Sequence, residues 1–480
     1  MTGRDQPIGP RERDHLLRNV QLPAAIAVSG GADSMALMHL VAGWAAGRAA
    51  DVPSGVSPIV VMTVDHALRP ESAEEAQWVG TEARKLGLEH VVLQWAGEKP
   101  RTGLQEAARV ARYDLICRHI GSEALQNPRQ VLLAHHLDDQ AETILMRLAR
   151  GSGVDGLSGM REVETRVWLR LGHPVEERLI SLHRPLLSIE GARLRTTLTA
   201  LGGTFRHDPS NDDPRHERVR LRQAAAARAD LGLTPRALAT TAVRMAAARA
   251  ALDSAQYALA QTAVDLHGGA WAGLDLTALM AAPGEVAVRL LRAVIVAMGG
   301  QDEPPKRAQL EELAGSLAGL KDGARTLGGT VIAIQQGKGE PEGQSRSVVA
   351  IYREQGRHPL PEITLRPGQG VFWDRRFYLS ASSALEYDVR IAPLGQVAFA
   401  RLKQEFPVLQ ADLPSRVAAT LPSFWHGSDL VAVPHLATVE PALAGPLCDG
   451  ACLLAAKFAD QHVRSIMGTF PAATGQPRRS

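Results

Sequence analysis

The strongest chemical signal is a Gly-rich segment that lies where a short apolar run ends and a helical pattern begins; it reads Ser29-Gly30-Gly31-Ala32-Asp33-Ser34. Its two glycines let the backbone turn tightly and approach an anion without a Cβ in the way. The N–H groups of the turn and the positive end of the following helix can then bind pyrophosphate. Because Asp33 would repel phosphate unless a cation lay between them, we expect Mg²⁺ at this carboxylate. The alternative is an ordinary strand-to-helix turn capped by Asp or Ser.

Polar residues follow other apolar runs in the same way. Asp65 and His66 come after the second run, His135 follows the fourth, and Arg112 lies on the helical pattern between the third and the fourth. Residues at the ends of parallel strands meet at one edge of a sheet, where such folds bind ligands. Each residue also has a structural interpretation: a turn-capping Asp, a hydrogen-bonding His or a solvated Arg.

Two carboxylates, Asp139 and Glu142, are three positions apart near the start of a helical pattern, so both point to one face. Asp138 and Asp139 could instead cap that helix, whose N-terminus favours carboxylates. Further along, an Arg-rich stretch could contact nucleic-acid phosphate or form a plain charged surface; it contains Arg193, Arg195, Arg206, Arg215, Arg218, Arg220 and Arg222.

The elements that must position these residues alternate along the first third of the chain. Apolar runs predict strands over 24–28, 59–64, 91–95 and 131–134, and helical periodicity predicts helices over 35–44, 71–86, 104–120 and 138–149. Repeated strand–helix units predict an α/β fold with a doubly wound parallel sheet. We therefore expect the Gly-rich segment and the acidic pair at the same edge of that sheet.

Three domains are expected from length and pattern. Residues 1–223 form the catalytic α/β domain, 224–345 a mainly helical domain that is rich in Ala and Leu, and 346–480 a small α+β module with short β-like runs. The segment Gly151–Gly156 matches G-x-G-x-x-G, but it follows a helix and not a strand, so we do not expect a dinucleotide site there.

The Gly-rich segment resembles the loop of the pyrophosphatase-loop ATPases, which cleave ATP between the α and β phosphates to adenylate a substrate. A longer series, which spans residues 29–222 in order, resembles the tRNA(Ile)-lysidine synthetases; its further members are Val64–Pro70, Ala111–Tyr113, His135–Thr143, Arg150–Gly153, Gly156-Leu157 with Met160, Arg184–Leu187, and Asp208–Asn211 followed by Arg218 and Arg222. Segments 421–425 and 430–434 are weakly similar to the family's terminal module. Val219 stands where the family usually has Asn, and His207 where it often has an acid.

The resemblance implies a reaction. ATP activates the carbon-2 oxygen of the wobble cytidine of a tRNA(Ile) with a CAU anticodon, and the lysine ε-amine then displaces AMP to give lysidine, so that the tRNA reads AUA. ATP, Mg²⁺, L-lysine and this tRNA are the implied partners, and the C-terminal half is assigned to recognition of the tRNA.

The same resemblance gives the candidate residues their roles. Segment 29–34 holds the phosphates, and Asp65 and His66 lie where the ribose or adenine would rest. Asp139 and Glu142 bind the lysine ammonium and help to deprotonate it, because its ordinary pKa is about 10.4; His135 is a second proton acceptor. Arg112 meets the adenylate phosphate or the lysine carboxylate. The candidates for tRNA binding are Arg206, Arg218 and Arg222.

Composition limits the alternatives. The net charge is only +2, so a surface for RNA must be local, and no apolar run is long enough to span a membrane, which makes the cytoplasm the expected compartment. Three cysteines without a C-x-x-C pair argue against tRNA thiolation, the nearest rival. Small-molecule adenylation and a non-catalytic nucleotide-binding regulator are the other rivals. The oligomeric state is left open, with a homodimer among the options.

Overall fold

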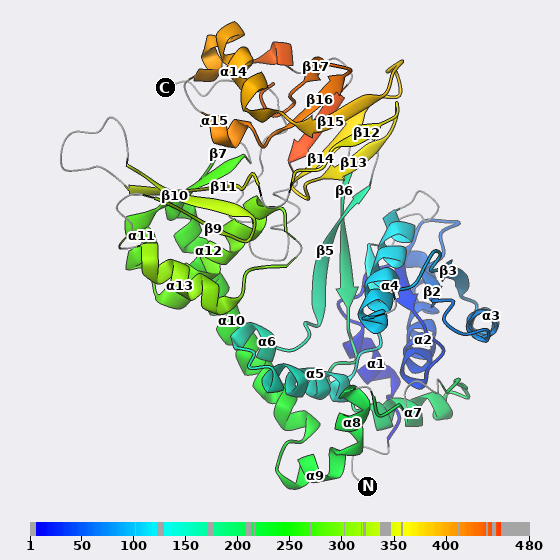
Figure 1. Ribbon diagram of the computed structural model, residues 1–480. Helices are drawn as coiled ribbons and strands as arrows, with labels where there is room; N and C mark the ends of the chain where they lie inside the picture. The colour runs from blue at the N-terminus through cyan, green and yellow to red at the C-terminus, as the bar shows by residue number, and fades with distance from the viewer. Residues whose placement is uncertain are drawn as a thin grey trace. The chain divides into compact units, whose positions relative to one another are not determined.

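The computed structural model describes the following parts of the chain: residues 6–100, 102–121, 129–170, 176–207, 213–215, 217–267, 270–301, 303–317, 319, 323–336, 347–356, 359–410, 413–437, 440–443 and 448–452. The chain divides into two compact units, which are drawn together in Figure 1. The first consists of residues 1–170 and 177–250, and the second of residues 171–176 and 251–480. No helix in these described parts is long and apolar enough to cross a membrane.

The first unit contains a six-stranded sheet in the order β3-β2-β1-β4-β6-β5. Its strands are β1 (Ala24–Ala27), β2 (Ile59–Asp65), β3 (Glu89–Gln94), β4 (Gln130–Leu132), β5 (Val163–Arg170) and β6 (Glu176–His183). The pairs β3–β2, β2–β1, β1–β4 and β4–β6 are parallel. The four strands expected from the apolar runs are thus confirmed, while β5 and β6 lie where we saw no regular pattern.

Alternation along β1 and β2 sends side chains to both faces of this sheet. Ile26 and Ile59 pack with one set of helices: α1 (Pro10–Leu16), α2 (Ala32–Ala45), α3 (Ser72–Lys85) and α7 (Gly191–Ala200). Ala25 and Val60 pack on the opposite face with α4 (Leu104–Gly121). Because apolar helices cover both faces, the doubly wound α/β prediction for this region is confirmed.

Helices after β4 complete the first unit. They are α5 (Leu137–Ala149), α6 (Val154–Leu157), α8 (Glu217–Gln223), α9 (Ala225–Asp230) and the first part of α10 (Pro235–Ala263). Ala141 and Ile144 of α5 form a small core with Leu238 and Ala242 of α10. Helix α5 therefore joins the sheet edge, where it begins, to the helices that follow.

The second unit is built around a five-stranded sheet in the order β7-β8-β11-β10-β9. These strands are β7 (Val264–His267), β8 (Trp271–Asp275), β9 (Ala324–Leu327), β10 (Thr330–Gln336) and β11 (Ser347–Arg353), and the helices are α11 (Leu276–Ala281), α12 (Gly284–Gly299) and α13 (Arg307–Leu317). Val349 and Ile351 pack on the helices, whereas Ala350 and Tyr352 pack on the C-terminal part of the chain.

That C-terminal part contains two more sheets, β12-β15-β16-β17 and β13-β14-β18. Their strands are β12 (Ile363–Leu365), β13 (Gly370–Trp373), β14 (Phe377–Ala381), β15 (Val389–Pro393), β16 (Pro422–His426), β17 (Asp429–Ala432) and β18 (Cys448–Cys452), and they are accompanied by α14 (Gly395–Glu405) and α15 (Ser415–Ala418). The segments 421–425 and 430–434, which are weakly similar to the family's terminal module, supply most of the antiparallel pair β16–β17.

The middle of the chain differs from the sequence prediction. Residues 224–345 were expected to be mainly helical, but they also supply four strands of the five-stranded sheet. The expected boundary at 345/346 falls between β10 and β11, which pair antiparallel along seven residues each. Strands β7, β8 and β9 are only four or five residues long, too short for alternation to stand out beside an Ala-rich helical pattern.

Candidate functional site

The Gly-rich loop joins β1 to α2, as expected. Gly31 is the N-cap of α2, and Gly30 has φ +88°, a left-handed conformation that favours glycine. A Cβ on Gly30 would also come within 3.3 Å of Val79 and 3.5 Å of Trp78. The Ser34 hydroxyl donates to the Gly31 carbonyl at 2.9 Å and accepts from the Ser29 N–H at 3.2 Å. The loop is thus held in shape by its own side chains, while the first N–H groups of α2 have no partner within the helix.

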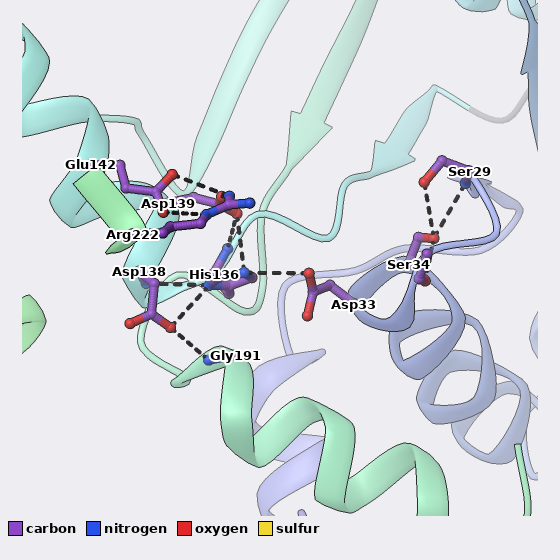
Figure 2. Close-up of polar contacts among 10 residues, drawn as sticks. Ser29, Asp33, Ser34, His136, Asp138, Asp139, Glu142, Gly191 and Arg222 are labelled. Atoms are coloured by element: carbon purple, nitrogen blue, oxygen red, sulfur yellow. Dashed lines mark hydrogen bonds and ion pairs between the residues drawn. The ribbon is translucent and has the colours of Figure 1, made fainter. Parts of the chain in front are cut away.

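Asp33, in the first turn of α2, faces away from the two serines and toward the start of α5 (Figure 2). Its Oδ2 lies 3.4 Å from Nε2 of His136, and its Oδ1 is buried without a hydrogen-bond partner among the described residues. A buried carboxylate oxygen without a donor costs free energy unless a cation or a ligand satisfies it. Asp33 is therefore poised for a further positive partner.

His136 is the N-cap of α5 and links three carboxylates. Its Nε2 lies near Asp33 and 3.5 Å from Asp139 Oδ2, and its Nδ1 lies 3.2 Å from the Asp138 N–H and 3.4 Å from Asp138 Oδ2. Burial alone would lower the pKa of this imidazole, but Asp138 and Asp33 raise it to about 10. As an imidazolium it donates to the carboxylates; as a neutral ring its Nδ1 accepts from the Asp138 amide.

The two other acids at this helix end have separate structural partners. Asp139 Oδ2 accepts from the His136 N–H at 3.1 Å, which completes a capping box. Asp138 Oδ2 accepts from the Gly191 N–H at 2.8 Å, where a Cβ on Gly191 would lie 3.0 Å from His136 Cε1. The capping interpretation is thus realised for Asp139, whereas Asp138 ties α5 to the start of α7.

Asp139 and Glu142 do point to one face, and Arg222 of α8 binds both (Figure 2). Arg222 Nε lies 2.6 Å from Glu142 Oε1, and its Nη2 lies 3.2 Å from Glu142 Oε2 and 3.5 Å from Asp139 Oδ1. Glu142 is only 2% exposed. Burial raises its pKa, although Arg222 opposes this. The acidic pair therefore forms an ion pair with Arg222, the residue that the sequence suggested as a candidate for tRNA contact.

His135 lies beside this group. Burial lowers its pKa to about 4; Asp139 works against this shift, and Arg184 and Arg218 add to it. Its Nδ1 is buried and has no hydrogen-bond partner in the described structure. The ring is therefore neutral at pH 7.

The second-strand candidates form a group of their own. Asp65 Oδ1 accepts from the Ala67 N–H at 2.8 Å and from the Ser72 hydroxyl at 2.7 Å, so Asp65 shapes the turn after β2. His66 Nε2 lies 3.5 Å from Arg112 Nη2, and its ring meets Trp95 edge-on at 5.8 Å. Burial, with help from Arg112, lowers the pKa of His66 to about 4.

Of the remaining arginines, Arg206 lies beside the Gly-rich loop 29–34, which is called the phosphate loop below. Its N–H donates to the Gly30 carbonyl at 2.9 Å, and its guanidinium lies 5.3 Å from the Trp78 ring centre. Arg184, in contrast, is 3% exposed and pairs with Glu164 at 2.7 Å, so its role is structural. Val219, which replaces the family's usual Asn, is buried. Segment Asp208–Asn211 lies outside the described residues.

Sequence reasoning missed three members of the site. His136 was passed over for its neighbour His135, although both follow the fourth strand. Gly191 and Trp95 carried no signal because their importance comes from what lies near them in space. An N-cap position before two acids could have identified His136 as the residue at the helix start.

The residues present fit one Mg²⁺ bound together with phosphate. No cluster of three or more metal-binding side chains occurs among the described residues, so a cage made by the protein alone is not found there. Mg²⁺ usually takes one or two carboxylates and completes its shell with phosphates and water. Asp33, with an unpartnered buried oxygen at the start of α2, matches that need.

Comparison with known proteins agrees with this geometry. The family described as PP-loop domain matches residues 11–228. This range includes the Gly-rich loop 29–34, His135, His136 and Arg222. The chain therefore contains a PP-loop domain, an ATP-binding α/β class.

The curated relatives of the chain indicate a narrower family. The tRNA(Ile)-lysidine synthase of Bradyrhizobium sp. is 44% identical over 64% of this chain and 83% of its own length. That of Ruegeria pomeroyi is 36% identical over 85% of this chain and 87% of its own length. The chain belongs to the tRNA(Ile)-lysidine synthase family. Among solved structures, the U34-tRNA thiolase NcsA of Methanococcus maripaludis has a TM-score of 0.38 at 16% identity, covering 49% of this chain and 77% of that one.

Proposed function

We propose that this chain ligates L-lysine to carbon 2 of the wobble cytidine in the CAU anticodon of tRNA(Ile), with conversion of ATP to AMP and pyrophosphate. The observation that carries the proposal is the meeting of two sites around His136. The Gly-rich loop, which would bind phosphate, lies on one side of His136, and the carboxylate pair Asp139 and Glu142, which would bind the lysine ammonium, lies on the other. A ligase that activates a base and then adds an amine needs both.

In the first step, the carbon-2 oxygen of cytidine bonds to the α-phosphorus of ATP, and the bond to pyrophosphate breaks. The backbone N–H groups of loop 29–34 and the N-terminus of α2 would bind the phosphates. Asp33 would hold Mg²⁺, which supplies charge neutralisation for the leaving pyrophosphate. Arg206, fixed to the Gly30 carbonyl, lies close enough to the loop to contact phosphate of ATP or of tRNA.

In the second step, the lysine ε-nitrogen bonds to carbon 2, AMP leaves, and the nitrogen loses a proton. Asp139 and Glu142 would bind the ammonium. Glu142 is a better proton acceptor than His135, because burial raises the pKa of its carboxyl while that of His135 falls to about 4. His66 and Arg112 would border the nucleotide, and Arg112 offers a planar donor fork to a phosphate or carboxylate.

The test is direct. Purified full-length protein is incubated with ATP, labelled lysine and total tRNA, and label in the RNA is measured together with AMP and pyrophosphate. Labelled tRNA with one AMP per lysine supports the proposal. ATP cleavage without lysine in the RNA would instead favour another adenylating reaction.

A further inference from the structure

The carboxylate pair of the proposed lysine pocket already holds a cation supplied by the chain. Arg222 binds Glu142 through two nitrogens at 2.6 and 3.2 Å and reaches Asp139 at 3.5 Å. Glu142 is buried, whereas the Arg222 side chain is 45% exposed. The carboxylates are thus the fixed part of the contact, and the arginine enters it from the surface.

A lysine ammonium would need the same oxygen atoms. Both oxygens of Glu142 and Oδ1 of Asp139 contact Arg222, and Asp139 Oδ2 accepts from the backbone of His136. A second cation at these oxygens would lie within a few ångströms of the guanidinium, where like charges repel. We therefore expect the lysine ammonium and the Arg222 guanidinium to compete for these oxygens.

We propose that Arg222 is a placeholder for the substrate's cationic side chain, which neutralises Asp139 and Glu142 until lysine displaces it. This inference rests on the proposed function. Arg222 is then a positioning residue that sets the affinity and the charge selectivity of the pocket. A neutral amino acid could not take its place, because it would leave the buried Glu142 carboxylate without the cation that now contacts both of its oxygens.

Displacement requires only the side chain of Arg222 to move. Helix α8 is attached to α5 at its other end by the pair Arg150–Glu217, at 2.5 Å, and its Val219 is buried. These contacts do not involve the guanidinium. Arg222 can leave by rotation about its own bonds into the solvent that it already meets, while α8 stays in place.

Displacement also predicts a measurable effect on lysine binding. The apparent dissociation constant of a ligand rises in inverse proportion to the fraction of molecules that can bind it. If Arg222 leaves the pair open in about a tenth of the molecules, lysine binds about tenfold more weakly than to a pocket without the arginine.

The test compares two matched variants of the full-length protein, Arg222→Met and Arg220→Met. Arg220 lies on the same helix but donates to the carbonyls of Pro214 and Arg215, both at 3.0 Å. Equilibrium binding of L-lysine, measured at about pH 8.5 to keep Glu142 ionised, should tighten about tenfold in Arg222→Met and stay unchanged in Arg220→Met. Guanidinium chloride at millimolar concentration should compete with lysine in Arg222→Met more strongly than equal sodium chloride.

Unchanged or weaker lysine binding in Arg222→Met, with a normal Arg220→Met, would overturn the placeholder role. If Arg222→Met does not fold, Arg222→Lys replaces it: the single ammonium loses the two-nitrogen contact, so lysine binding should again tighten. Adding Glu142→Gln to Arg222→Met distinguishes a wrong placeholder role for Arg222 from a wrong location of the lysine pocket. With no competing arginine, that change must weaken lysine binding; no effect would place the lysine pocket elsewhere.

Discussion

The phosphate loop and the acidic pair occupy the same edge of one sheet but are built differently. The loop is a single stretch of six residues whose serines hydrogen-bond to one another and to its own backbone. The acidic pair, in contrast, has its main contact with a residue far away in the sequence: Arg222, 80 positions from Glu142. His136 lies between them and contacts Asp33 and Asp139. In the proposed reaction, a local motif would thus bind the phosphates, and contacts between distant parts of the chain would set the selectivity for lysine.

The largest effect is expected in the loop. Asp33→Ala should lower lysine incorporation about 100-fold or more, because the carboxylate that would hold Mg²⁺ beside the phosphates is lost. The side chain is partly exposed, so the variant should remain folded. Labelled lysine in tRNA and the melting temperature are measured in parallel. Normal incorporation by a folded variant would remove Asp33 from the phosphate site.

The acidic pair should give a smaller and more selective effect. Glu142→Gln in the Arg222→Met background should raise the lysine KM about tenfold, because a charge-assisted hydrogen bond becomes a neutral one. In the wild-type background the rise should be smaller, because Arg222 also binds the altered pair less tightly. Adenylate formation, trapped without lysine, should persist in both. Its loss would move Glu142 to the nucleotide or the metal, and the contrast with the loop would disappear.

The neutral His135, beside the acidic pair, should matter less. His135→Gln should lower the maximal rate about threefold, as expected for loss of a neutral hydrogen bond. His135 is uncharged above about pH 4, so the shape of the rate profile between about pH 6 and 9 should not change. A step near pH 6.5 that vanished in the variant would show that His135 titrates during turnover.

The smallest effect is expected for contacts to tRNA phosphate. Binding of tRNA should weaken as salt rises despite the net charge of +2, because the arginines act locally. Arg218→Ala should reduce the slope of log affinity against log salt by about 0.9 if it neutralises one duplex phosphate. Equal slopes for Arg218→Ala and wild type would exclude a phosphate contact by Arg218.

Much of the first unit follows from short-range pattern. The runs around Ile26 and Val61 are continuous and apolar because both faces of a parallel sheet are covered, and the segment after Val28 needs Gly30 for its left-handed turn. These are properties of neighbouring residues, so they can be predicted from the sequence. In the second unit, the short strands β7, β8 and β9 lie next to long Ala-rich helical patterns, and β10 lies in a segment whose Gly and charge content predicted a linker, so the five-stranded sheet was not predicted.

The sequence by itself determined the phosphate loop, the α/β framework and the presence of two acids on one face of α5. The tertiary structure decided which groups those acids meet. It placed Arg222 on Glu142, His136 beside Asp33, and the Gly191 N–H on Asp138. The physical reason is distance along the chain: periodicity reports neighbours within a few residues, whereas a buried ion pair depends on where separate helices are packed.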